Sequence, residues 1–161
     1  MRYKTGLRAY TAKRLEEIDR ADILVGIPCY NNQDTIAHVV QSVSHGLHDH
    51  YRDRRAVIMI ADGGSTDDTR EAAKDFEIKP WQEKIVSIYR GPGGKGSAFR
   101  SLFEAAVRLS ATACMVVDSD LRSITGDWVK YLLDPVLEKG FDYVSPVYSR
   151  YKYDGTITNN I

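Results

Sequence analysis

The sequence predicts a single α/β domain of Rossmann-like type, in which a mostly parallel sheet is covered by helices on both faces. Short apolar segments alternate with amphipathic segments along nearly the whole chain. The apolar segments are continuous and rich in β-branched residues, which is typical of strands buried on both faces. The length of 161 residues is enough for one domain with a substantial core, and no repeat or internal linker interrupts it.

The first elements of this pattern are a helical extension, a strand, a helix and a second strand. We expect the extension at residues 1–21. Residues 22–30 read DILVGIPCY, an apolar run that ends in turn-forming residues and predicts a buried strand. Residues 33–47 carry apolar side chains at spacings of three and four, which is the period of an amphipathic helix. Residues 56–61 are again continuously apolar and predict a strand that leads into a glycine-rich turn.

The next unit is a short helix followed by a strand. A helix is predicted from residue 67 to about residue 76, with Ser65 or Thr66 as its N-cap, because a hydroxyl oxygen can accept a hydrogen bond from the first helical turn. Residues 83–91, which read EKIVSIYRG, predict another strand. A glycine-rich loop, residues 93–96, follows that strand.

The last elements repeat the alternation. Residues 97–109 have one apolar face and predict a helix, and residues 112–118 predict a short strand. Residues 127–140 predict a helix that kinks or splits at Pro135, since proline removes a helical hydrogen bond. Residues 141–149 predict a final strand.

Composition and charge give no support to several classes of function. Lys plus Arg (22) equals Asp plus Glu (22), so the net charge gives no reason to expect a nucleic acid or an anionic membrane as partner. No apolar run approaches the roughly 20 residues of a transmembrane helix, and the N-terminus lacks the apolar core of a signal peptide. Cys29 and Cys114 are expected to be free buried thiols, without the spacing of a zinc site. We therefore expect a cytoplasmic protein.

Polar and glycine residues gather at four predicted strand ends. Ligands of an open parallel sheet bind beyond the carboxyl ends of its strands, so these residues should share one edge. The candidate site residues are, in chain order, Pro28, Tyr30, Asn32, Asp62, Lys95, Asp118 and Asp120.

The segment DSD, residues 118–120, is the most specific of these signals. Two carboxylates one residue apart repel each other unless a cation offsets the repulsion, and hard oxygen ligands favour Mg²⁺ or Mn²⁺. The loop GPGGKG suits a phosphate group, because glycines let backbone N–H groups approach an anion. It lacks the P-loop pattern, and the first strand–helix turn lacks the GxGxxG of dinucleotide sites.

Four segments together resemble the GT-A nucleotide-sugar glycosyltransferases of the broad family-2 type. In order they are ILVGIPCYNNQDTI, ADGGSTDDT, GGKGSAFRS and VVDSDL. The GKG loop, the DSDL segment and the later DYVSPVYSRYKYDGTITNNI resemble a retaining subgroup, the glucosyl-3-phosphoglycerate and mannosylglycerate synthases, which make compatible-solute precursors. The resemblance covers about residues 22–161 and implies that they form the nucleotide-binding half of a GT-A fold.

The resemblance implies a role for each matching residue. Pro28, Tyr30 and Asn32 would line the nucleotide pocket, although many members carry Glu at the position of Asn32. Asp62 would bind the base and Lys95 the phosphates. The nucleotide would also contact Asp118, and Mg²⁺ or Mn²⁺ would bind to Asp120 and Asp118, which form a DXD motif. The acceptor would bind at Gly155, Thr156, Ile157 and Thr158.

The implied function is a metal-dependent glycosyltransferase that moves a sugar from a UDP- or GDP-sugar to a small hydroxylated acceptor such as glycerate or phosphoglycerate, with retention. We identify no catalytic side chain, and a homo-dimer is an open possibility. Residues 1–161 are expected to be one domain truncated at its C-terminus, which binds the nucleotide but transfers sugar poorly alone. The alternatives are a nucleotidyltransferase, whose glycine-rich loop normally follows the first strand, or an inactive nucleotide-binding or regulatory module of the same fold.

Overall fold

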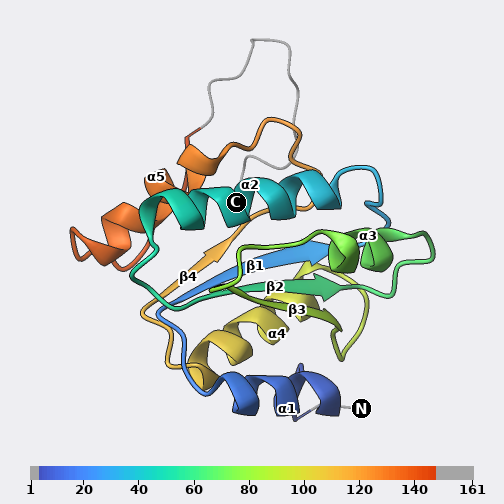
Figure 1. Ribbon diagram of the computed structural model, residues 1–161. Helices are drawn as coiled ribbons and strands as arrows, with labels where there is room; N and C mark the ends of the chain where they lie inside the picture. Colours follow the sequence, from blue (N-terminus) through green and yellow to red (C-terminus); the bar gives the residue numbers. More distant parts are fainter. Residues whose placement is uncertain (1–3, 148–161) are drawn as a thin grey trace.

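The computed structural model describes residues 4–147, which form a three-layer α/β arrangement (Figure 1). The central sheet has four strands in the order β3-β2-β1-β4, and every neighbouring pair is parallel. The strands are β1 (Ile23–Cys29), β2 (Ala56–Asp62), β3 (Glu83–Ile88) and β4 (Ala113–Val116). This confirms the predicted α/β class with a parallel sheet.

Helices cover both faces of the sheet, as Figure 1 shows. One face carries α2 (Ile36–His50), α3 (Thr69–Asp75) and α5 (Gly126–Leu137), and the other carries α1 (Ala9–Ile18) and α4 (Lys95–Arg108). Successive strand residues point to opposite faces, so Val25 packs under α2 whereas Leu24 packs against the α4 side. Every residue of β1 and β2 is buried, which explains their continuous apolar sequence.

Two predicted features of α3 and α5 are wrong in detail. The helix α3 begins at Thr69, and neither Ser65 nor Thr66 caps it. The carboxylate of Asp67 accepts the hydrogen bond from the Thr69 N–H instead (3.1 Å). The helix α5 runs through Pro135 as one element, so the predicted split is wrong, and only two residues follow the proline before the helix ends; the predicted kink stays a prediction.

The predicted final strand, residues 141–149, is also wrong over its described part. Residues 141–147 form no strand, and residues 148 and 149 lie outside the described part of the chain. The N–H of Phe141 donates to the carbonyl of Pro135 (3.0 Å), and the side chains of Phe141, Tyr143 and Val147 are exposed. A segment of high strand propensity forms a strand only where a neighbouring strand supplies backbone hydrogen bonds. Residues 141–147 have no such neighbour within residues 4–147.

The two cysteines differ in environment. Cys29 is buried at the end of β1, as predicted, but Cys114 is exposed, contrary to the prediction. Cys114 lies in β4, which pairs only with β1 among the described strands and so forms an edge of the sheet.

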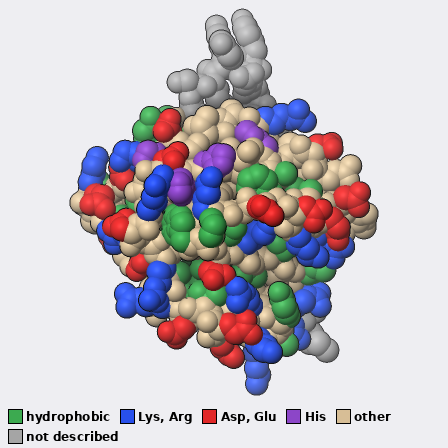
Figure 2. Space-filling view, in the orientation of Figure 1, with side chains coloured by type: hydrophobic (Ala, Val, Ile, Leu, Met, Phe, Trp, Pro, Cys, Tyr) green, Lys and Arg blue, Asp and Glu red, His purple; other side chains and the backbone are tan. Residues whose placement is uncertain are grey.

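The surface mixes charges of both signs. Figure 2 shows basic and acidic side chains interspersed over the face that it draws. Within residues 4–147, no helix combines the length and apolar character required to cross a bilayer.

The N-terminal segment is tied to the body through Glu104 of α4. This carboxylate accepts hydrogen bonds from the Thr5 hydroxyl (2.6 Å), the Gly6 N–H (2.8 Å) and the Arg108 guanidinium (3.0 Å). Partial burial acts to raise the pKa of Glu104, but these hydrogen bonds outweigh it and hold the pKa below its ordinary value.

We expect Glu104→Gln to lower the free energy of unfolding by about 1–2 kcal/mol at neutral pH, because it removes the charged acceptor. A depressed folded-state pKa stabilises the protein above the unfolded pKa of about 4.3, and that stabilisation is lost as pH falls through the folded value. The difference between wild type and variant in urea titrations should therefore shrink below pH 4. A difference that is constant with pH would contradict this account.

The crossing of α2 and α5 requires glycine. A Cβ at Gly46 would lie closer than contact distance to the carbonyl oxygen of Gly126 and 2.7 Å from Cγ2 of Val129. We expect Gly46→Ala to destabilise the fold by about 1–3 kcal/mol, because the backbone of α5 would have to move. Gly96→Ala, where a Cβ would meet open space at the start of α4, is the control and should not lower the thermal midpoint.

Candidate functional site

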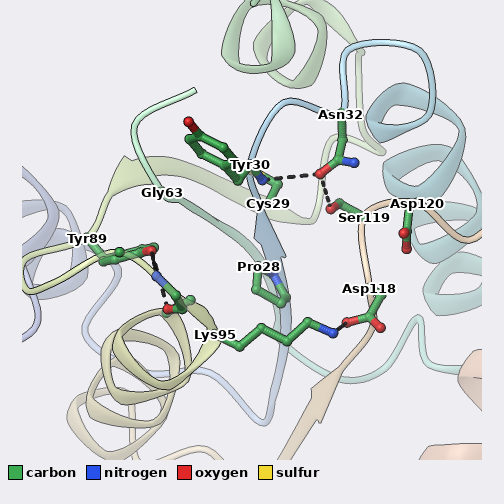
Figure 3. A pocket seen from close by; sticks show the side chains of 13 residues that line it. Pro28, Cys29, Tyr30, Asn32, Gly63, Tyr89, Lys95, Asp118, Ser119 and Asp120 are labelled. Atoms are coloured by element: carbon green, nitrogen blue, oxygen red, sulfur yellow. Dashed lines mark hydrogen bonds and ion pairs between the residues drawn. The ribbon is translucent and has the colours of Figure 1, made fainter. Parts of the chain in front are cut away.

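A pocket of about 580 Å³ lies beyond the carboxyl ends of the strands, between the loops that follow β1, β2, β3 and β4 (Figure 3). The register explains this convergence, since Cys29 of β1 lies beside Asp62 of β2, and Gly26 lies beside Val116 of β4. All of the predicted nucleotide and metal residues except Asp62 line the pocket: Pro28, Tyr30, Asn32, Lys95, Asp118 and Asp120. The predicted acceptor residues Gly155, Thr156, Ile157 and Thr158 lie outside the described part of the chain.

Lys95 and Asp118 form an ion pair across the pocket. The ammonium Nζ lies 2.8 Å from Oδ1 of Asp118, and the two side chains are 65% and 43% exposed. The carboxylate of Asp120 is exposed and makes no hydrogen bond or ion pair with any described residue. Lys95 therefore supplies the cation that offsets part of the repulsion between the two carboxylates, while Asp120 is available to a ligand.

The loops after β1 and β4 are joined by side-chain hydrogen bonds (Figure 3). Oδ1 of Asn32 accepts from the Tyr30 N–H (3.1 Å) and from the Ser119 hydroxyl (2.7 Å). The hydroxyl of Thr35 donates to the Ser119 carbonyl (2.8 Å). Because the Tyr30 N–H can only donate, the Asn32 side chain must turn its amide oxygen toward it. The amide nitrogen Nδ2 of Asn32 then points elsewhere and has no hydrogen-bond partner among the described residues.

The loops after β1 and β2 interlock in the same way. The Asn31 side-chain oxygen accepts from the Thr66 N–H (2.9 Å), and the Gln33 N–H donates to the carboxylate of Asp67 (3.2 Å). Partial burial acts to raise the pKa of Asp67, but hydrogen bonds from Thr69 and Gln33 hold it below the ordinary value. Asp67, Asp120 and Arg122 also line a second hollow of about 410 Å³ beside the first.

The glycine-rich loop is held by Tyr89, which the sequence analysis missed. The Gly94 N–H donates to the Tyr89 hydroxyl (3.0 Å), and that hydroxyl lies 3.3 Å from the Gly94 carbonyl. Gly94 has φ of 129° and precedes the first residue of α4, so glycine is needed there. The only sequence signal for Tyr89 is its place at the end of a predicted strand.

Asp62 is buried behind the pocket rather than exposed to it. Its carboxylate accepts from the Gly64 N–H (2.9 Å), from the Ser65 N–H (3.0 Å) and from the Ser65 hydroxyl. Nε of Arg70 lies 3.8 Å away, and Asp62 itself has no exposed surface. Burial, followed by the charge of Asp62, raises the pKa of the neighbouring Cys29 thiol, so Cys29 stays protonated. The predicted contact of Asp62 with a base stays a prediction.

The residues present suit a hard cation that is shared with a ligand. Asp118 and Asp120 bring two carboxylates to the pocket, and Mg²⁺ typically binds through one or two carboxylates plus phosphate oxygens. No group of three or more His, Cys, Asp or Glu side chains within residues 4–147 is placed to hold a metal by itself. Any cation bound here therefore needs oxygen atoms from a ligand or solvent.

The parallel sheet, the glycine loop at the start of α4 and the paired carboxylates at the end of β4 define a GT-A, Rossmann-like domain. The chain belongs to glycosyl transferase family 2, whose family model matches residues 24–160. It is 36% identical to glycosyltransferase AglJ of Haloferax volcanii over 118 aligned residues, and this alignment covers 73% of this chain and 33% of AglJ.

Solved structures of one enzyme show the same fold. Glucosyl-3-phosphoglycerate synthase of Mycobacterium tuberculosis matches with 30% identity and a TM-score of 0.56, over 86% of this chain and 49% of that one. Its complex with Mn²⁺ and UDP-glucose matches with 26% identity and a TM-score of 0.56, over 86% and 46% of the two chains. The chain thus spans about a third to a half of the length of these relatives.

Asp62 could either stabilise the turn after β2 or contact the base of the nucleotide, and a substitution distinguishes these two roles. If the carboxylate stabilises the turn after β2, Asp62→Asn should lower the free energy of unfolding by about 2 kcal/mol, because an NH₂ group would face the Ser65 N–H and Arg70 would lose its counter-charge. Urea titration measures this, with the exposed Asp68→Asn as control. Unchanged stability together with lost UDP binding would favour the predicted base contact.

Proposed function

We propose that this chain is the donor-binding domain of a metal-dependent glycosyltransferase. Its substrate would be a UDP- or GDP-sugar, held with Mg²⁺ or Mn²⁺ in the pocket between Lys95 and Asp120. The proposal rests on one observation: the glycine-rich loop and Lys95, which follow β3, lie in the same pocket as Asp118 and Asp120, which follow β4.

Each part of the pocket suits a different part of a nucleoside-diphosphate sugar. The start of α4 and Lys95 offer positive charge to the diphosphate. The exposed ring of Tyr30 and the free Nδ2 of Asn32 offer an aromatic surface and a donor to the nucleoside. Asp118 would exchange its pairing with Lys95 for the cation when the diphosphate draws Lys95 away.

The cation, when bound, neutralises charge that develops on the diphosphate leaving group as the sugar–phosphate bond breaks. Asp120 would hold it directly, because this carboxylate has no partner within residues 4–147. Asp118 would be a second ligand or would contact the ribose. No described side chain lines the pocket as an obvious nucleophile, since the buried Cys29 thiol is held protonated.

The acceptor belongs to the proposal as well. The similarity to glucosyl-3-phosphoglycerate synthase favours a small hydroxylated acceptor such as glycerate or phosphoglycerate. The resemblance of the GKG loop and the DSDL segment to the retaining synthases leads us to include transfer with retention and a cytoplasmic role in making compatible-solute precursors. One solved complex of that enzyme contains Mn²⁺, UDP and phosphoglyceric acid. For this chain, the acceptor contacts would come from residues 155–158.

Calorimetric titration with UDP and with GDP, each with and without Mn²⁺, tests the donor site. We expect one of the two to bind only when Mn²⁺ is present. Preference for a nucleoside triphosphate would favour the nucleotidyltransferase alternative, and the absence of binding would favour an inactive module.

We expect Asp120→Ala to weaken the Mn²⁺-dependent binding by at least about 10-fold, because it removes the free carboxylate. Its thermal midpoint should not fall, since Asp120 has no partner among the described residues to lose. Asp142→Ala, an exposed carboxylate outside the pocket, is the matched control. Unchanged, still metal-dependent affinity in Asp120→Ala would overturn the assignment.

A further inference from the structure

We propose that Tyr89 is a positioning residue that fixes residues 91–94, the part of the glycine-rich segment that precedes α4. By fixing them it would place Lys95 for the diphosphate of the nucleotide. The proposal rests on the proposed function, because it explains how the same pocket is held in a binding-competent shape. Tyr89 lines the pocket, but its hydroxyl is engaged by Gly94 of the loop, so we assign its effect to the placement of Lys95 (Figure 3).

Apart from the first turn of α4, which donates to the Gly94 carbonyl, few contacts hold the loop. It contains three glycines, and a Cβ at Gly93 or Gly94 would meet no atom within 4 Å, so these two residues are not packed against the body. Gly91 and Gly94 have φ of 133° and 129°, and no side chain caps the start of α4. Glycine-rich backbone loses much conformational entropy when it is ordered, so a specific contact is needed to fix it.

The Tyr89 hydroxyl supplies that contact. It accepts a hydrogen bond from the Gly94 N–H at 3.0 Å and lies within donating distance, 3.3 Å, of the Gly94 carbonyl. The Gly94 carbonyl also accepts from the N–H groups of Ser97 (3.2 Å) and Ala98 (3.4 Å), so the contact specific to Tyr89 is the one with the Gly94 N–H. Gly94 immediately precedes Lys95, so fixing its backbone sets the direction in which the lysine side chain leaves α4.

Tyr89 is itself rigid. Its side chain is 7% exposed and belongs to the core cluster under α4, with Met59 and Ala98. Its N–H donates to the Asp62 carbonyl at 3.2 Å, continuing the pairing of β3 with β2. A Cβ at Gly63 would lie 3.1 Å from the Tyr89 hydroxyl, so the loop after β2 closes on it from the other side. The Tyr89 side chain therefore connects the core of the protein to Gly94 of the loop.

The competing interpretation is purely structural, in which the hydroxyl only completes the hydrogen bonds of a buried side chain and has no effect on Lys95. A double-mutant cycle separates the two, since residues that act through one another are not additive. The four proteins are wild type, Tyr89→Phe, Lys95→Met and the double variant, and the measurement is the dissociation constant for UDP with Mn²⁺.

We expect Tyr89→Phe to weaken UDP binding about 5- to 10-fold, the effect of one or two lost hydrogen bonds, and Lys95→Met to weaken it at least as much. The double variant should bind no more than about 2-fold more weakly than Lys95→Met alone. Tyr131→Phe, an exposed tyrosine on α5, is the control and should match wild type. Unchanged binding in Tyr89→Phe, or fully additive losses, would overturn the proposal.

Hydrogen exchange of the Gly94 amide distinguishes failure of this proposal from failure of the proposed function, because it needs no nucleotide. The amide should exchange about 10-fold faster in Tyr89→Phe than in wild type. If wild type does not bind UDP or GDP, the proposed function fails, and an unchanged exchange rate overturns the positioning role separately. Should Tyr89→Phe not fold, Gly94→Ala, which strains the loop from outside the core, replaces it in the cycle.

Discussion

Burial of β1 on both faces is the constraint on which the rest of the structure depends. All seven of its residues are buried, with α2 and α5 packing on one side and α4 on the other. Since β1 pairs in parallel with β2 and β4, their carboxyl ends come to a common edge. Loops that are far apart in sequence thus meet in one pocket, and apolar residues that never touch a ligand decide where the polar ones lie.

Many polar side chains at that edge form hydrogen bonds with neighbouring loops and so stabilise the fold. Asn32, Ser119 and Thr35 join the loops after β1 and β4, and Asp62 closes the turn after β2. Asn32 and Asp62 look like ligand contacts in the sequence because they are polar residues that follow or end predicted strands. In the structure they order the loops before any ligand arrives, which lowers the entropy lost on binding. Among the described residues, the carboxylate of Asp120 and the amide nitrogen of Asn32 have no protein partner and are available to a ligand.

The sequence was informative where local pattern and tertiary structure agree. The strands β1 and β2 were predicted within one residue of each end, because continuous apolar runs bounded by turn residues have few other uses. The cap of α3 and the strand over residues 141–147 were wrong, since which side chain reaches an N–H and whether a strand finds a partner are decided by neighbours distant in sequence. The bond of Tyr89 to Gly94 was likewise not predictable from either residue type.

The outer edge of β4 has a consequence for handling the protein in solution. Within residues 4–147 this strand pairs only with β1, and Cys114 projects from it with its side chain exposed. Where no strand outside residues 4–147 covers it, such an edge can associate with an identical edge, and an exposed thiol can then be trapped by oxidation as a cross-link between two molecules. Apparent dimers should therefore be compared under reducing and oxidising conditions before a two-fold assembly is assigned.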